Sequence, residues 1–197
     1  MSFENLNIES INNCPGLDFS SGLKTKLFFA PASHFFYTPL PKPGISFESE
    51  IIIVDEIIMR SEKKLFSIDV LVEENELRVN LTGNKEKKRS VTNFAFFILG
   101  FRPSVLGFVK RCKNVPMIFF IQDANGNNWQ IGHSLTRAFM EAAESWSGKK
   151  YEDNSGAAVT VNCNSSVFLY QKSLEHFAKP GDFNLDFNND FYITDND

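Results

Sequence analysis

The clearest structural signal in this sequence is a β-hairpin. Residues 117–122 and 129–132 are two apolar runs, and the segment between them reads Asp-Ala-Asn-Gly-Asn-Asn. Asn-Gly favours a tight turn because both residues tolerate positive φ, so the two runs can fold back on each other as antiparallel strands. The same Asp and Asn residues offer oxygens to a calcium ion, but an EF-hand requires flanking helices and a downstream bidentate Glu. We therefore expect a turn and no metal site.

Other segments rich in β-branched and aromatic residues also predict strands. They are residues 26–30, 45–81, 94–99, 159–163 and 167–171. We expect two or more long strands within residues 45–81. Leu77, Val79 and Leu81 alternate with polar residues there, which is typical of a strand with one face exposed to solvent. Residues 94–99 are expected to pair back on that strand as a second hairpin.

A basic cluster lies at the expected tip of this second hairpin. It contains Lys85, Lys87, Lys88 and Arg89, and Glu86 interrupts it. Such a cluster can contact phosphates, but no aromatic residues interleave with it as a stacking platform for nucleic acid requires. We therefore expect a solvated tip, whose charge would matter if the tip lined a channel.

Two segments carry helical spacing. Residues 102–113 are the better candidate, because Pro103 suits the first turn of a helix and apolar residues recur at helical intervals. Residues 134–145 are open to either a short helix or an irregular excursion, because Gly148 follows soon after. The chain is thus predicted to be mainly β with one helix.

The length of 197 residues, with 43% hydrophobic and 22% charged residues, suits one globular domain with appended segments. We expect an N-terminal arm at residues 1–25, a β domain at residues 26–172 and an acidic, aromatic C-terminal extension at residues 173–197. In the extension, Asp residues alternate with Phe residues spaced by four. It is either a flexible acidic tail or an arm that docks on a neighbouring subunit.

The composition argues against several functional classes. The formal net charge is −4, so the protein lacks the global basic field that would hold nucleic acid or an anionic membrane. Cys14, Cys112 and Cys163 lack metal-ligand spacing and are expected to be reduced thiols. The N-terminal residues do not resemble a signal peptide, and no apolar run approaches the roughly 20 residues that cross a bilayer. We expect a soluble protein made in a cytoplasm.

Recognisable catalytic motifs are also missing from the sequence. There is no phosphate-binding loop, nucleophile elbow or zinc-binding His pair. His34, His133 and His176 occur in unrelated contexts and are expected to be surface or capping residues. We expect no catalytic residue, cofactor or metal. The aromatic run Phe35 to Tyr37 is either an exposed patch or a cover for one end of the core.

From residue 27 to residue 170, the order of several motifs resembles a known family. The motifs are FFAPASHF with the prolines after it, LTGNKEKKRS leading to FAFFILG, SVLGFVKRC, MIFFIQDANGNNWQIGH and SGKKYEDNSGAAVTVNC. In this order they resemble the tail tube proteins of long-tailed bacteriophages and prophages of the Bacteroidetes group. Residues 139–146 and the C-terminal extension depart from the family pattern.

The resemblance implies a β-sandwich or β-barrel with one flanking helix and long hairpins. It also implies a non-enzymatic virion protein of the tail, made in the host cytoplasm, whose stacked hexameric rings form a conduit for DNA. The expected partners are further copies of the chain, other tail proteins and, transiently, DNA. We expect the lumen strands within residues 45–81, with Glu73, Glu76, Arg78 and Asn80 on the wet side.

Two alternatives remain open. One is another virion assembly protein, such as a tail terminator, a connector or a head decoration protein. The other is a ligand-binding β-barrel, in which Trp129 and Trp146 would line a pocket.

Overall fold

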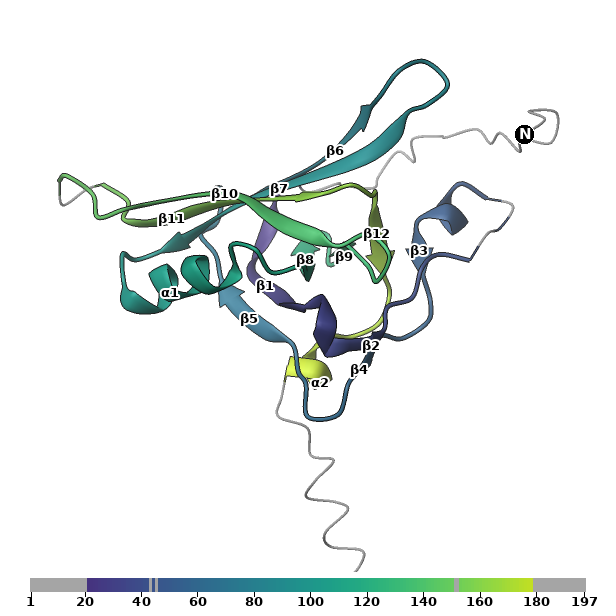
Figure 1. Cartoon of the computed structure of the whole chain (residues 1–197), viewed down its shortest axis with the longest axis horizontal. Helices are drawn as coiled ribbons and strands as arrows, with labels where there is room; N and C mark the ends of the chain where they lie inside the picture. The colour runs from purple at the N-terminus through teal and green to yellow at the C-terminus, as the bar shows by residue number, and fades with distance from the viewer. Residues whose placement is uncertain (1–20, 43, 45, 151–152, 179–197) are drawn as a thin grey trace, which may run out of the picture.

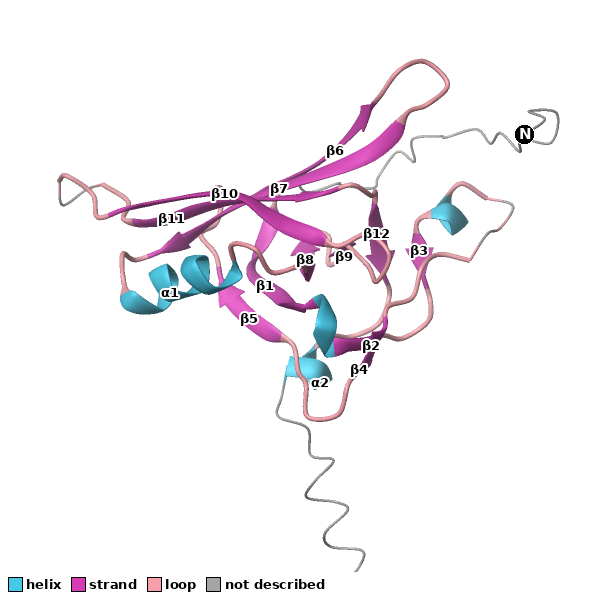
Figure 2. Ribbon diagram, in the orientation of Figure 1, coloured by secondary structure: helices cyan, strands magenta, loops and turns pink. Residues whose placement is uncertain are grey.

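The computed structural model describes residues 21–42, 44, 46–150 and 153–178, and it shows a mainly β protein (Figure 2). Ten strands form one hydrogen-bonded sheet. Strands β8 and β10 meet only where Ala138 pairs with Met117, so the sheet divides at this point into two layers.

The first layer has six strands in the order β5-β1-β8-β9-β12-β3. Its strands are β1 Leu23–Pro31, β3 Ile52–Ile53, β5 Phe66–Asp69, β8 Met117–Asp123, β9 Asn128–Ile131 and β12 Val167–Tyr170. All neighbours are antiparallel except β12 and β3, which are parallel.

The second layer, called here the four-stranded layer, has the order β6-β7-β11-β10 and is antiparallel throughout. Its strands are β6 Glu76–Thr82, β7 Arg89–Leu99, β10 Ala138–Trp146 and β11 Gly156–Cys163.

The main core lies between the two layers, as in a β-sandwich. On β11, Ala157, Val159, Val161 and Cys163 are buried while the residues between them are partly exposed, which is the period of two expected for a strand with one buried face. Aromatic rings join the layers: Phe119 of β8 lies 6.3 Å from Phe94 and 6.4 Å from Phe96, both of β7, between ring centroids. Such contacts add specific geometry to a large buried apolar area.

Helix α1, Pro103–Cys112, packs against this core. Val105 is buried, and the ring of Phe108 lies edge-on to Phe29 of β1 at 5.4 Å. Pro103 occupies the first turn, where its missing N–H costs no hydrogen bond, and basic residues end the helix where they complement its dipole.

A second, smaller core covers the other face of the six-stranded layer. It is built around Ile118, Phe120 and Tyr170, and Ile57, Leu65 and Leu174 pack on them from the connecting segments. The Tyr170 hydroxyl accepts a hydrogen bond from the Ile57 N–H at 3.3 Å. The 3-10 helix Ala32–His34, strands β2 Phe35–Tyr37 and β4 Ile58–Met59 and helix α2 Glu175–Ala178 belong to this cover, and the short 3-10 helix Glu48–Glu50 precedes β3.

Most predicted elements are confirmed. The strands expected at residues 26–30, 94–99, 159–163 and 167–171 correspond to β1, β7, β11 and β12. Both predicted hairpins are present, as β8–β9 and β6–β7, and the predicted helix is α1. The β-sandwich with one flanking helix and long hairpins is therefore the fold of this chain. The expected N-terminal arm lies outside the described residues up to residue 20, and the C-terminal extension lies outside them from residue 179.

The prediction of long strands across residues 45–81 was wrong for most of that range. Strands β3 and β4 have two residues each and β5 has four, so only β6 is long. The branched residues in this range include Ile53 and Ile57, which are buried in the second core as separate anchors of a covering segment. A local apolar run does not distinguish such anchors from the face of a continuous strand.

The prediction for residues 134–145 was wrong from residue 138 onward, where the chain forms β10 rather than a helix or an irregular excursion. Leu135 and Phe139, which suggested helical spacing, are 80% and 47% exposed, so they do not form a buried helical face. Ala138 and Met140 face the core instead, and a bulge between Met140 and Ala142 interrupts the strand period.

Candidate assembly surface

The four-stranded layer has two open edges. Strand β6 pairs with β7 alone, and β10 pairs with β11 and, only at Ala138, with β8. The backbone N–H and C=O groups along the outer side of each edge strand therefore have no ladder partner among the described strands. Open edges of this length are normally covered or paired with another chain.

The two hairpins of this layer project from opposite ends (Figure 1). Thr82 pairs with Arg89 at one end of β7, and Gly156 pairs with Leu99 at the other. The β6–β7 hairpin extends beyond the core: Leu77 packs on the core, but Leu81 is 69% exposed. The prediction of a charged, exposed tip is confirmed, because all residues from 81 to 89 are exposed.

The central rows of the outer face of the layer are polar. The registers place Arg78, Asn93 and Asn162 in one row across three strands, and Glu76, Ala95 and Thr160 in the next. Asn162 Nδ2 donates to Asn93 Oδ1 at 2.9 Å. Arg78 Nε lies 2.7 Å from Glu76 Oε1.

Of the residues expected on a wet side, Glu76, Arg78 and Asn80 are exposed and share this outer face. Glu73 lies in the turn before β6, with a φ of 66°. The exposed face that carries them extends over β6, β7, β10 and β11, and of these strands only β6 lies within residues 45–81.

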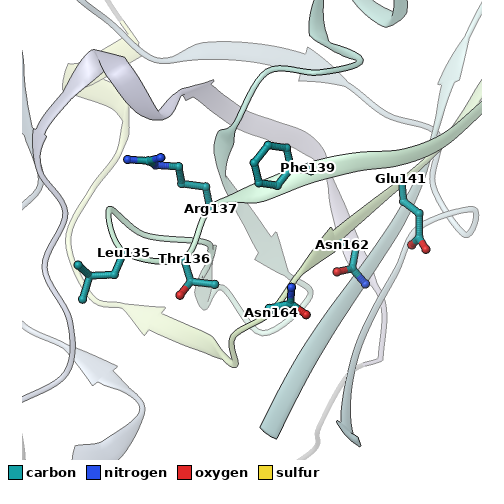
Figure 3. Close-up of a pocket in the computed structure, with 7 residues that line it drawn as sticks. All are labelled: Leu135, Thr136, Arg137, Phe139, Glu141, Asn162 and Asn164. Carbon is teal, nitrogen blue, oxygen red and sulfur yellow. The ribbon is translucent and has the colours of Figure 1, made fainter.

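A hollow lies over the paired strands β10 and β11, near the start of β10 (Figure 3). Its lining combines the apolar Leu135 and Phe139 with the charged Arg137 and Glu141, and Asn162 forms part of its wall. Large apolar side chains exposed next to an unpaired strand are typical of surfaces that another protein covers. The sequence did not indicate this hollow, because its residues 135–141 were assigned to a helix or an irregular segment.

The Asp123 carboxylate organises the β8–β9 turn. Its oxygens accept hydrogen bonds at 2.9 Å from the Asn125 and Asn127 N–H groups, from Asn127 Nδ2 and from Trp129 Nε1. Partial burial alone would raise the pKa of Asp123, but the hydrogen bonds, first those from Trp129 and Asn127, outweigh it and lower the pKa. The carboxylate oxygens are thus engaged in the turn. No group of metal-ligating residues occurs within the described part of the chain.

His133 was expected to be a surface or capping residue, but it is buried, and its ring organises the turn that follows it. Its Nδ1 accepts hydrogen bonds from the N–H groups of Leu135 and Thr136, at 3.2 and 3.4 Å. Burial lowers the pKa of His133, and it also lowers the pKa of His34, with help from the nearby Lys63 charge. His176 lies in α2. Neither His34 nor His133 is paired with a carboxylate among the described residues, which is the arrangement that would activate a histidine as a base.

The described cysteines are not activated nucleophiles. Burial raises the pKa of Cys163 to about 11 and also raises the pKa of Cys112, so both thiols stay protonated at neutral pH. Both are free thiols, and Cys14 lies outside the described residues.

The remaining aromatic candidates lie apart. Phe35 is buried in the second core, whereas Phe36 and Tyr37 are exposed, so the aromatic run serves as both a cover and a patch. Trp129 donates to Asp123 beside the main core, whereas Trp146 lies on the outer face of β10 over Phe97. The two tryptophans thus have separate surroundings.

Within the described residues, helices are too short or too polar to cross a membrane. No family model, no curated protein and no solved structure matches this chain.

Proposed function

We propose that this chain is a non-enzymatic tail tube subunit whose copies form hexameric rings, and that the rings stack into a conduit for DNA in a phage tail. One observation carries the proposal: the four-stranded layer has two open edges, a buried inner face and an outer face whose central rows are polar. The edges need strand partners, and copies of the same chain can supply them.

Strand direction favours closure into a ring. The order β6-β7-β11-β10 alternates in direction, so β6 and β10 run opposite ways. A rotation axis that places β6 of one copy beside β10 of the next therefore continues the antiparallel pattern, and closing the ring removes both edges. Six copies give about 24 strands, more than the 16–18 that already leave an aqueous channel in porins.

The outer face suits the lining of such a channel. Its central rows carry Asn, Thr and Ala, and Arg78 is paired with Glu76. Glu141 and Glu144 add negative charge on β10. A lining without an excess of positive charge does not hold DNA through many phosphate contacts, so DNA can pass.

Electron microscopy of the purified protein, together with sedimentation velocity, tests the proposal. We expect rings and stacked tubes. Single rings that never stack would favour a tail terminator or connector, and a strictly monomeric protein at high concentration would exclude ring formation.

Hydrogen exchange supplies an independent measurement on the same samples. Amides of β6 and β10 should gain protection when dilute protein is concentrated into assemblies. Amides of β7 and β11 serve as the internal control, because both strands already have partners on each side. Equal protection of β6 and β10 before and after assembly would contradict pairing at the edges.

A further inference from the structure

The two ends of the four-stranded layer differ in chemistry. The β6–β7 tip carries Lys85, Lys87, Lys88 and Arg89 against the single acid Glu86, a net charge of +3. Among the described residues, none of these four cations forms an ion pair. The tip turns tightly at Gly83, which has a φ of +110° and lies so close to the Lys87 carbonyl that a side chain there would collide with it.

The opposite end of the layer carries an acidic and aromatic hollow on the outer face. Glu74, Phe97, Trp146 and Asn154 line it. The rings of Phe97 and Trp146 lie 5.3 Å apart, and Trp146 is 40% exposed and fixed by a 2.7 Å hydrogen bond from Nε1 to the Asn154 carbonyl.

Two further carboxylates flank this hollow. Glu144 pairs across β10 and β11 with Ala158, which lines the hollow, and Glu76 pairs with Ala95, which also lines it, but Glu76 already forms an ion pair with Arg78. Glu74 is exposed and forms no ion pair with another described residue. Glu74 and Glu144 therefore offer carboxylates without an ion pair among the described residues, beside an exposed indole ring.

We propose that the basic β6–β7 tip of one copy docks at the acidic, aromatic hollow of a second copy. Lysine and arginine pair with carboxylates and also bind the face of a tryptophan, so the tip matches both features of the hollow. Within one molecule, β7 spans about 20 to 26 Å at 3.3 Å per residue from Arg89 at the tip to Ala95 and Phe97 at the hollow, which is farther than one side chain reaches, so a molecule cannot fill its own hollow.

Because the contact joins two different surfaces, it is head to tail and repeats from copy to copy. This inference rests on the proposed function and deepens it: the open edges build each ring, and the tip-to-hollow contact joins one ring to the next.

A charge reversal at the tip tests the contact. We expect K87E/K88E to form rings but not tubes. The matched control is K63E/K64E, because Lys63 and Lys64 are also an adjacent, exposed pair, in the loop between β4 and β5. The control should form tubes like the wild type, and adding E74K and E144K to K87E/K88E should restore stacking. Tubes of normal length from K87E/K88E would overturn the inference while leaving ring formation intact.

Zero-length carbodiimide cross-linking gives a readout that does not depend on tubes. In a mixture of isotopically light and heavy wild-type protein, mass spectrometry should detect a mixed cross-link between a tip lysine and Glu74. Absence of this cross-link at concentrations where the copies associate would also overturn the inference. If the wild type forms no rings but shows the cross-link, the ring proposal fails and the docking contact stands.

Discussion

The turn between β8 and β9 depends on one carboxylate. Asp123 accepts four hydrogen bonds from groups that would otherwise need water, including the indole N–H of Trp129. A side chain of this kind fixes both the turn and the tryptophan behind it, which explains why an Asp begins the Asp-Ala-Asn-Gly turn.

Asp123→Ala should destabilise the fold by about 2 kcal/mol at pH 7, because hydrogen bonds to a charged group are lost from a partly exposed site. The lowered pKa means that this stabilisation is complete above the ordinary Asp pKa and is lost as the pH falls through the folded value. Urea unfolding at pH 7 and in strong acid measures the difference, which should shrink in acid. The exposed Asp69→Ala is the control. An unchanged difference in acid would contradict the role of the charge.

His133 should make stability depend on pH in the opposite way from a paired histidine. Burial lowers its folded pKa, so below about 6.5 the unfolded chain binds a proton that the folded chain does not. Stability should therefore fall as the pH drops from 7 toward 5. His133→Asn should flatten this slope in unfolding titrations, and His34→Asn should remove a further part. An identical slope in the double variant would show that neither histidine is responsible.

At the scale of elements, α1 contains a glycine that lowers its helix stability. Gly107 lies in the middle of the helix on its exposed side, and a Cβ there would meet no atom within 4 Å. Gly107→Ala should stabilise the protein by about 1 kcal/mol, because alanine restricts the unfolded chain and favours the helix. Thermal unfolding measures the gain.

Gly132→Ala is the contrasting control for that prediction. Its φ is +85°, and a Cβ would lie 3.0 Å from the Ala138 backbone nitrogen, so this change should destabilise the protein. Loss of stability in both variants would show that α1 does not tolerate a side chain at Gly107.

The elements that could be predicted are those with strong local signals. The Asn-Gly turn was enough to predict the β8–β9 hairpin, and Pro103 with the apolar spacing after it was enough to predict α1. Strand β10 could not be predicted in the same way. Its outer face mixes Phe139, Glu141 and Ala142, and its bulge shifts the alternation, so the pattern that identifies a strand is lost.

At the scale of the molecule, the candidate surface was only partly predictable. Glu76, Arg78 and Asn80 were expected on a solvent-facing side because the alternation of polar and apolar residues can be read along a single strand. The open edges were not predictable, because they depend on β7 pairing with β11 across 57 or more residues. The hollow at Trp146 depends on the same long-range pairing.

The two proposed contacts should respond differently to salt. The tip-to-hollow contact is electrostatic, and at 1 M salt the screening length falls to about 3 Å. The edge contact relies on backbone hydrogen bonds and burial, which salt affects much less. Raising the salt concentration should therefore break tubes into rings before rings dissociate, as seen by sedimentation velocity. Rings that dissociate while tubes remain joined would contradict this assignment.

The central claim is that β6 of one copy pairs with β10 of the next. Electron cryomicroscopy of the assembled protein, at a resolution that separates strands, tests it most directly. The predicted result is a continuous antiparallel barrel, with β6 beside a neighbouring β10 and with Asn93, Asn162 and Thr160 facing the channel. Assemblies in which both edge strands face solvent, or a protein that remains monomeric at every concentration, would contradict it.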